Sequence, residues 1–249
     1  MAGHSKWSQI KRKKGLKDQQ KGKIFSKLTR QITLAVLEGG GITDPDKSVK
    51  LRIAMDQARR ENMPKENIQR AIEKGVGPDR EKLQEVMYEG FGPEGISLLI
   101  QVTTDNSNRT HSEVKSVLDR HNGKIGTQGS VGYLFQKCAI ITFDKVKNAE
   151  DAVFTFADQV QVLDIDEDDS NITVYFPFEN LGRISNYLGG LEANPAEVDY
   201  RPLSTVKINN QQTAKKIIDL IEALESLDDV QKVYSNFDIP EEFLTSPHL

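Results

Sequence analysis

The chain has 249 residues, of which 37% are hydrophobic and one is cysteine, and its formal net charge is −4. This composition is typical of a globular chain of one to three domains, and it excludes disorder throughout and an internal disulfide. No apolar run reaches the roughly 18 residues that a membrane span needs, so we expect a cytoplasmic protein without a membrane partner.

Positive charge is concentrated at one end of the chain. The first thirty residues contain ten basic residues and one acidic residue, Asp18, which gives a formal charge of +9. Because the whole chain sums to −4, the remaining residues carry −13. A cationic segment on an anionic body indicates a polyanionic partner, and nucleic acid is the partner we expect.

The next part of the chain predicts three helices. A helix over residues 5–21 would be interrupted by glycines, but from Lys23 apolar residues recur at helical spacing until Gly39. Asp44 and Pro45 predict the start of a second helix. Pro64 predicts the start of a third, with Gly75 at its end. Residues 1–79 are therefore expected to form a basic helical domain.

From about residue 80 the hydrophobic period changes to two, which predicts strands alternating with helices. Asn106 is the expected cap of the first helix of this part, and Pro177 the expected start of a later one. The predicted strands lie at about 86–91, 96–103, 131–136, 139–144, 161–166, 171–176, 196–201, 204–208 and 230–235, with helices near 107–118, 152–157, 177–188 and 214–224.

The order of these elements predicts how they divide. Residues 139–201 alone follow the pattern βαββαβ, and the flanking segments supply two further strand-helix-strand units. We therefore predict an α+β protein with an N-terminal three-helix domain and two ferredoxin-like βαββαβ domains, one inserted into the other. The predicted boundaries are 1–79, 80–137 plus 203–240, and 138–202 for the inserted domain. Two domains in series is the weaker alternative, because it leaves the last unit without sheet partners.

Several motifs suggest an enzyme but fail on context. Residues 90–95 match G-x-G-x-x-G, yet a strand follows where a dinucleotide site needs a helix, so a hairpin turn is expected. The acidic run at 164–169 lacks the spacing of a calcium loop. The four histidines are dispersed. We predict no catalytic residue, no metal ion, no cofactor and no small-molecule substrate. The glycine-rich loop at 123–132 could still approach a phosphate backbone, with Lys124 supplying a charge.

The basic segment has two interpretations: a solvated tail, or a surface that binds phosphates. The second is favoured because Trp7, which is costly to leave in water, lies among the lysines and could stack on an exposed base. Lysine contacts suit backbone or shape recognition better than base reading. The predicted nucleic-acid-binding residues are His4, Lys6, Trp7, Lys11, Arg12, Lys13, Lys14, Lys17, Lys21, Lys23, Lys27, Arg30, Arg109 and Lys124.

Six motifs in order resemble the YebC/PmpR family. They are MAGHSKW at the start, KGKIFSKL at 21–28, EGGG at 38–41, YEGFGPEG at 88–95, DNSNRT at 105–110 and GTQGSVGYLF at 126–135. The resemblance implies three domains. It also implies a functional role for the positions that match the family motifs, namely His4, Lys6, Trp7, residues 21–23, residues 108–110 and the loop at 126–129. The middle of the arm and residues 139–201 depart more from the family pattern.

The resemblance implies a cytoplasmic factor in gene expression. The family has been described as DNA-binding transcription regulators and also as ribosome-associated factors that help translation through proline-rich stretches. We therefore expect a DNA-binding regulator, with binding to ribosomal RNA as the alternative. The alternative has support, because no helix of the basic segment is recognisable as one that reads a groove. An RNA-modifying enzyme is a third hypothesis, for which the sequence shows no acid or base.

Overall fold

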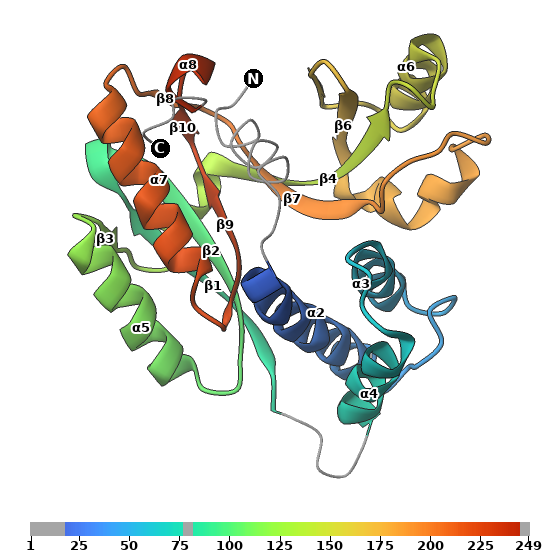
Figure 1. Cartoon of the computed structure of the whole chain (residues 1–249), viewed down its shortest axis with the longest axis horizontal. Helices are drawn as coiled ribbons and strands as arrows, with labels where there is room; N and C mark the ends of the chain where they lie inside the picture. Colours follow the sequence, from blue (N-terminus) through green and yellow to red (C-terminus); the bar gives the residue numbers. More distant parts are fainter. Residues whose placement is uncertain (1–17, 77–81, 245–249) are drawn as a thin grey trace.

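The computed structural model describes residues 18–76 and 82–244. Within them the chain forms a helical part and two four-stranded antiparallel sheets (Figure 1). The protein is therefore of the α+β class, as predicted. None of the helices in these two ranges is long and apolar enough to cross a membrane.

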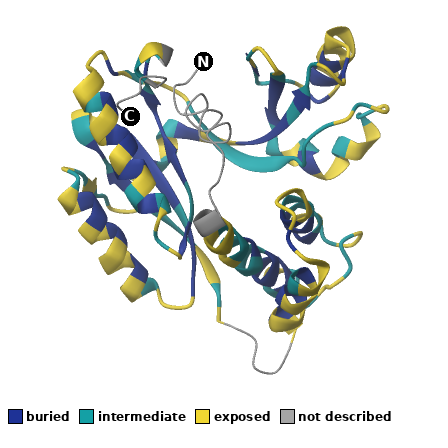
Figure 2. Cartoon of the chain, in the orientation of Figure 1, coloured by how far each residue is buried: buried dark blue, intermediate teal, exposed yellow. Residues whose placement is uncertain are grey.

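The three helices of the first part are confirmed. They share a core in which Leu28, Ile32 and Val36 of the first helix pack against buried residues of the other two. Their apolar residues recur at helical spacing, so one stripe of each helix is buried and the opposite face is exposed (Figure 2). The helices are α2 (Asp18–Glu38), α3 (Val49–Arg60) and α4 (Lys65–Val76).

Two details of this part differ from the sequence prediction. Helix α3 begins after Ser48 rather than at Pro45, because the Ser48 hydroxyl accepts a hydrogen bond from the Leu51 amide and so caps the helix. Gly75 lies inside α4, where it does not end the helix. A Cβ atom there would lie 2.7 Å from the Cβ of Val36, so the glycine allows α4 to approach α2 closely.

The first sheet has the strand order β3-β1-β2-β9. Two helices cover one of its faces and enclose the largest apolar core, which includes Leu98, Ile100, Val114 and Ile217 (Figures 1 and 2). Residues 92–95 form the predicted hairpin turn between β1 and β2. The elements are β1 (Gln84–Phe91), β2 (Ser97–Thr104), α5 (Ser107–Arg120), β3 (Lys124–Ile125), α7 (Gln211–Glu225) and β9 (Val230–Ser235).

The second sheet has the order β5-β6-β4-β7, and all of its strand pairs are antiparallel. Its core lies between the sheet and two helical segments, where Phe143, Phe156 and Phe176 are buried. The helix predicted after Pro177 is present and is a 3-10 helix, η3. The elements are β4 (Phe135–Asp144), α6 (Glu150–Gln159), β5 (Asp164–Glu167), β6 (Asn171–Pro177), η3 (Phe178–Asn186) and β7 (Glu197–Pro202).

Strand β9 pairs with β2, although the whole second sheet lies between them in sequence. This pairing is what the predicted insertion requires. The composition of the first sheet differs from the prediction. Residues 132–134 form a 3-10 turn, η2 (Gly132–Leu134), and β1 occupies the position between β2 and β3. The predicted strand at 204–208 is reduced to β8 (Val206–Lys207), which pairs in parallel with β10 (Phe237–Asp238) before the last helix, α8 (Glu241–Leu244).

Candidate nucleic-acid interface

The predicted binding residues divide into two groups. His4, Lys6, Trp7, Lys11, Arg12, Lys13, Lys14 and Lys17 lie outside the described residues. Of the others, Lys21 and Lys23 are exposed on the first turns of α2, and Lys27 and Arg30 are half-buried further along the same helix. Arg109 and Lys124 are exposed on α5 and β3. The structure brings Arg30 and Arg109 together at Asp229. Lys124 lies on β3, at the opposite edge of the first sheet from β9.

The lysines of α2 contact the end of α7. The Lys27 ammonium donates to the carbonyl oxygen of Glu225 at 2.6 Å, and Lys23 donates to that of Ser226 at 3.3 Å. These carbonyls belong to the last turn of α7, where main-chain acceptors lack helical partners and the helix dipole favours a cation. Both lysines therefore hold the helical part against the first sheet domain.

Arg30 and Arg109 converge on the buried carboxylate of Asp229, which is only 4% exposed. Arg30 forms an ion pair with Oδ1 of Asp229, and Arg109 Nη2 lies 2.9 Å from Oδ2. Hydroxyl groups complete the arrangement: Thr110 and Thr104 donate to Oδ2 at 2.5 and 3.1 Å. Asp229, in the turn before β9, thus contacts side chains from α2, β2 and α5. We call Asp229 and its partners Arg30, Arg109, Thr104 and Thr110 the Asp229 cluster.

The cluster changes the proton affinity of Asp229. Burial raises the pKa of this carboxyl group, but hydrogen bonds from Thr110, Arg30 and Arg109 outweigh burial and lower the pKa to about 2. The group is therefore ionised at neutral pH and compensates the charge of two arginines that were predicted to bind nucleic acid. Sequence reasoning missed Asp229, because 199 residues separate it from Arg30 and no local pattern connects the two.

The glycine-rich loop after β3 is organised by an internal carboxylate. Glu89 on β1 accepts hydrogen bonds from the amides of Gly129, Val131 and Gly132 at 2.7, 2.6 and 2.8 Å. Burial raises the pKa of Glu89, yet these hydrogen bonds hold it below its ordinary value. These three amides therefore pair with Glu89 inside the molecule, and an approach of the rest of the loop to a phosphate backbone stays a prediction.

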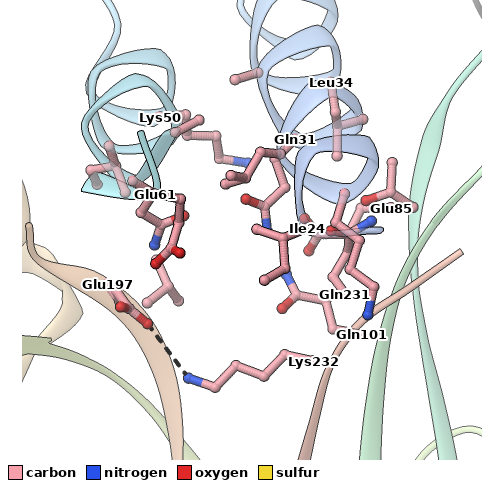
Figure 3. Close-up of a pocket in the computed structure, with 18 of the residues that line it drawn as sticks. Ile24, Gln31, Leu34, Lys50, Glu61, Glu85, Gln101, Glu197, Gln231 and Lys232 are labelled. Atoms are coloured by element: carbon pink, nitrogen blue, oxygen red, sulfur yellow. Dashed lines mark ion pairs between the residues drawn. The ribbon is translucent and has the colours of Figure 1, made fainter. Parts of the chain in front are cut away.

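A cleft of about 550 Å³ lies between the helical part and both sheets (Figure 3). We call it the interdomain cleft. Helices α2 and α3 form one side of it, and strands β1, β2, β7 and β9 form the rest. Lys232 of β9 lies 3.9 Å from Glu197 of β7 across its floor, so the two sheets are joined there by an ion pair. This cleft could not be predicted from the sequence, because its lining comes from six separate elements.

Comparisons with known proteins cover nearly the whole chain. A family model described as the TACO1/YebC protein N-terminal domain matches residues 5–78, and one described as the TACO1/YebC second and third domain matches residues 83–237. The chain is 43% identical over 247 residues to a protein of Aquifex aeolicus named "Probable transcriptional regulatory protein", with 98% of each chain covered. A protein of Nitrosococcus oceani with the same name is 44% identical over 250 residues, again with 98% of each chain covered.

The fold is also similar to a solved structure. A crystal structure of a conserved hypothetical protein from Aquifex aeolicus matches with a TM-score of 0.83 and 40% sequence identity. The match covers 92% of this chain and 95% of that chain. The arrangement of the helical part and two sheets is therefore shared with an experimentally determined relative.

Proposed function

The chain belongs to the TACO1/YebC family, and we propose that it is a nucleic-acid-binding regulator of gene expression without catalytic activity. In this proposal the basic N-terminal segment and the start of α2 contact the phosphate backbone. The two acidic sheet domains set the position of that contact or bind protein.

One observation carries the proposal: the first thirty residues have a charge of +9, whereas the rest of the chain has −13. Neutralising phosphates with lysines releases counterions, so such a segment binds polyanions with an affinity that depends strongly on salt. Lys21 and Lys23 continue the basic segment onto an exposed part of α2. The name of the curated relatives is consistent with this function and favours DNA as the target.

A second candidate, binding to ribosomal RNA in support of translation, is favoured by the geometry of α2. Arg30 of this helix contacts Asp229, and Lys27 contacts the end of α7, so the side of α2 that carries them lies against the first sheet domain. A helix held in this way cannot insert the same side chains into a major groove. Recognition of backbone and shape, which is typical of proteins that bind structured RNA, fits this arrangement better.

The division into residues 1–79, 80–137 plus 203–240, and 138–202 is part of the proposal. The sheet pairing of β9 with β2 supports it. A discontinuous second domain would keep both chain ends of the inserted domain fixed on the first sheet. The inserted domain would then present its exposed surface to a partner in a fixed position relative to the first sheet.

The role of the basic segment can be tested by charge reversal. Replacing Lys11, Arg12, Lys13 and Lys14 with Glu in the full chain should weaken binding to duplex DNA and to a ribosomal RNA fragment. If about six cations contact duplex phosphates, the wild-type slope of log affinity against log salt should be about −5, and the variant slope should be smaller in magnitude. Fluorescence anisotropy between about 50 and 300 mM salt, from about threefold below to about twofold above physiological ionic strength, measures both quantities.

The matched control reverses the same number of charges elsewhere. Lys115, Arg120, Lys215 and Lys216 are exposed on α5 and α7 and do not belong to the first thirty residues. Reversing these four should leave the salt slope near that of the wild type. Equal binding by the two variants would contradict the assigned role. Co-sedimentation with ribosomes, compared with binding to promoter DNA at physiological salt, then decides between the two targets.

A further inference from the structure

We propose that the face of the second sheet opposite α6 and η3 binds residues 1–17 of the same chain while no nucleic acid is bound. The inference rests on the proposed function, in which the basic segment contacts phosphates, and it adds an internal competitor for that segment. The side chains of this surface include Cys138, Ile140, Asp164, Asp166 and Tyr175, and we call it the open face.

The pleat of β4 separates the open face from the face that the helices cover. Ala139 and Ile141 belong to the core under α6 and η3, so the alternate residues Cys138 and Ile140 point to the other side of the sheet. Tyr175 of β6 lies opposite Ile140 in the antiparallel register and shares that side. The open face is therefore a separate surface from the main core of this domain.

The apolar side chains of the open face are hidden from water. Ile140 and Tyr175 are buried, and Cys138 is 0% exposed. In the described part of the chain, the apolar contacts of this cluster are limited to its own members and to Leu163, which precedes β5. A sheet face is buried by a layer packed against it. The burial of this face therefore points to a covering layer from outside the described ranges.

Three segments lie outside those ranges, and the N-terminal one fits best. Residues 77–81 connect α4 with β1, and residues 245–249 contain neither lysine nor arginine. Residues 1–17 contain apolar side chains for the cluster, Trp7 and Ile10. An extended chain of this length spans up to roughly 55 Å, which exceeds the roughly 33 Å of a strand as long as β4.

Charge also favours this segment as the occupant. Residues 138–202 contain thirteen acidic and four basic residues, so the domain has a formal charge of −9. Residues 1–17 contain six basic residues and no acidic residue, which gives +6. The domain and the segment are thus electrostatically complementary, and a tether to α2 keeps the segment at a high effective concentration near the domain.

One carboxylate of the open face lacks a counter-ion in the described ranges. Asp164 pairs with Arg201 at 2.5 Å. Asp166 is 3% exposed and accepts a hydrogen bond from the Tyr175 hydroxyl at 3.0 Å, but no basic side chain of residues 18–76 or 82–244 forms an ion pair with it. Burial raises the pKa of Asp166, because the ionised form is poorly solvated there. A lysine or arginine of the N-terminal segment would supply the missing positive charge.

The contact has a consequence for binding. Nucleic acid and the open face need the same lysines, so the segment has to leave the face before it can contact phosphates. The apparent affinity for nucleic acid is then reduced by the fraction of molecules in which the segment is free. The acidic domain thus acts as an internal competitor, which a polyanion of high charge density displaces more readily than a weak one.

The first test uses Cys138, the single cysteine of the chain, as a probe of the open face. N-ethylmaleimide, which is small and uncharged, labels the native full chain, and mass spectrometry follows the rate. Saturating duplex DNA should raise the rate by about tenfold, whereas inorganic phosphate at equal ionic strength should not. Charge reversal of residues 11–14 should raise the rate similarly without DNA. The four-charge control variant on α5 and α7 should react like the wild type.

The outcomes of this test are distinct. Equal rates in the variant of residues 11–14 and its control overturn the proposal, and so does DNA that binds without changing the rate. A wild-type rate that falls as the protein concentration rises also overturns it, because a second copy would then cover the face. Hydrogen exchange of the β4 and β6 amides should stay unchanged in the variant. Labelling that accelerates only together with this exchange reports unfolding and overturns the proposal.

The second test removes charge from the open face. The double variant Asp164→Asn and Asp166→Asn should bind duplex DNA about threefold or more tightly than the wild type, because the competitor is weakened. The matched control, Asp151→Asn and Asp158→Asn, removes two exposed charges from α6 in the same domain and should bind like the wild type. Equal affinities of the two variants overturn the proposal. Absence of DNA binding by the wild type would instead refute the proposed function, while labelling of the variant of residues 11–14 still reports on the open face.

Discussion

Asp229 is the residue on which segments far apart in the sequence converge. Two arginines and two threonines direct donors at a carboxylate that is only 4% exposed. Arg30 belongs to the helical part and Arg109 to the first sheet domain, so the group joins two parts of the molecule. The free energy of this contact depends on the charge of a single side chain.

Replacing Asp229 with Asn should lower the free energy of unfolding by about 2–4 kcal/mol at neutral pH, because Arg30 and Arg109 lose their shared anion. Urea denaturation measures the change. Asp228→Asn, an exposed neighbour, is the control and should lie within about 0.5 kcal/mol of the wild type. A loss no larger than that of the control would show that the cluster contributes nothing to stability.

The same contact predicts a pH dependence. The folded-state pKa of Asp229 is about 2, below the value near 3.9 of an unfolded chain, so ionised Asp229 stabilises the fold by about 2–3 kcal/mol. This contribution is fully present above about pH 5 and is lost progressively as the pH falls towards about 2. The stability difference between the wild type and Asp229→Asn should therefore shrink between pH 5 and pH 2, and a constant difference would contradict the lowered pKa.

The candidate site shows what sequence can predict at the scale of residues. Arg30 and Arg109 were selected for their charge and for a family motif, and the structure does place them close together. Their shared partner could not be predicted, because a buried Asp before a strand resembles a turn residue in sequence. Glu89 escaped prediction for the same reason: its three amide partners lie at least 40 residues further along the chain.

At the scale of elements, the packing of α4 on α2 depends on one glycine. A Cβ at Gly75 would lie 2.7 Å from the Cβ of Val36 and 3.0 Å from the carbonyl oxygen of Thr33. Gly75→Ala should therefore lower the free energy of unfolding by about 1–3 kcal/mol, although alanine favours a helix. Thermal unfolding of the full chain measures the change.

Gly22 provides the matched control for this substitution. It lies in α2, and nothing is within 4 Å of the Cβ that alanine would add there. Gly22→Ala should raise stability by roughly 0.5–1 kcal/mol, because only the helix preference changes. If both variants gain stability, the close approach of α4 to α2 is not limited by Gly75.

The elements themselves were largely predictable because local signals fix them. Hydrophobic periodicity located all three helices of the first part, and Asn106 caps α5 as expected, accepting a hydrogen bond from the Arg109 amide. Assignment of strands to sheets was harder. The strand predicted at 131–136 has suitable residues, but Glu89 binds the amides of this segment and η2 replaces its first half.

At the scale of the whole molecule, the helical part contacts both sheets and so closes the interdomain cleft. Arg30 joins it to the first sheet domain through Asp229, while Ile53 packs against the core of the second and Arg60 lies 3.7 Å from Glu197. The two sheets contact each other directly where Tyr200 and Tyr234 pack with ring centroids 5.0 Å apart. Each pair of parts that borders the cleft is thus joined by at least one direct contact.

Replacing Ile53 with Asp should release the helical part from the second sheet, because a charge in that contact must keep its hydration. Differential scanning calorimetry should then show the helical part unfolding at a lower temperature than the sheets. Ile42→Asp, at a position that is already 38% exposed, is the control and should keep the wild-type profile. Identical profiles for the two variants would mean that Ile53 does not couple the parts.

The pairing of β9 with β2 has a consequence for synthesis on the ribosome. One edge of β2 stays unpaired until β9, which ends at residue 235, has left the exit tunnel. The helical part and the second sheet can be complete by residue 202. Nascent chains of intermediate length therefore expose the unpaired edge of β2 and an apolar sheet face that α5 covers but α7 does not yet cover. Both features promote aggregation. The first sheet contains the strand that is translated first, β1, yet it is the later of the two four-stranded sheets to be completed.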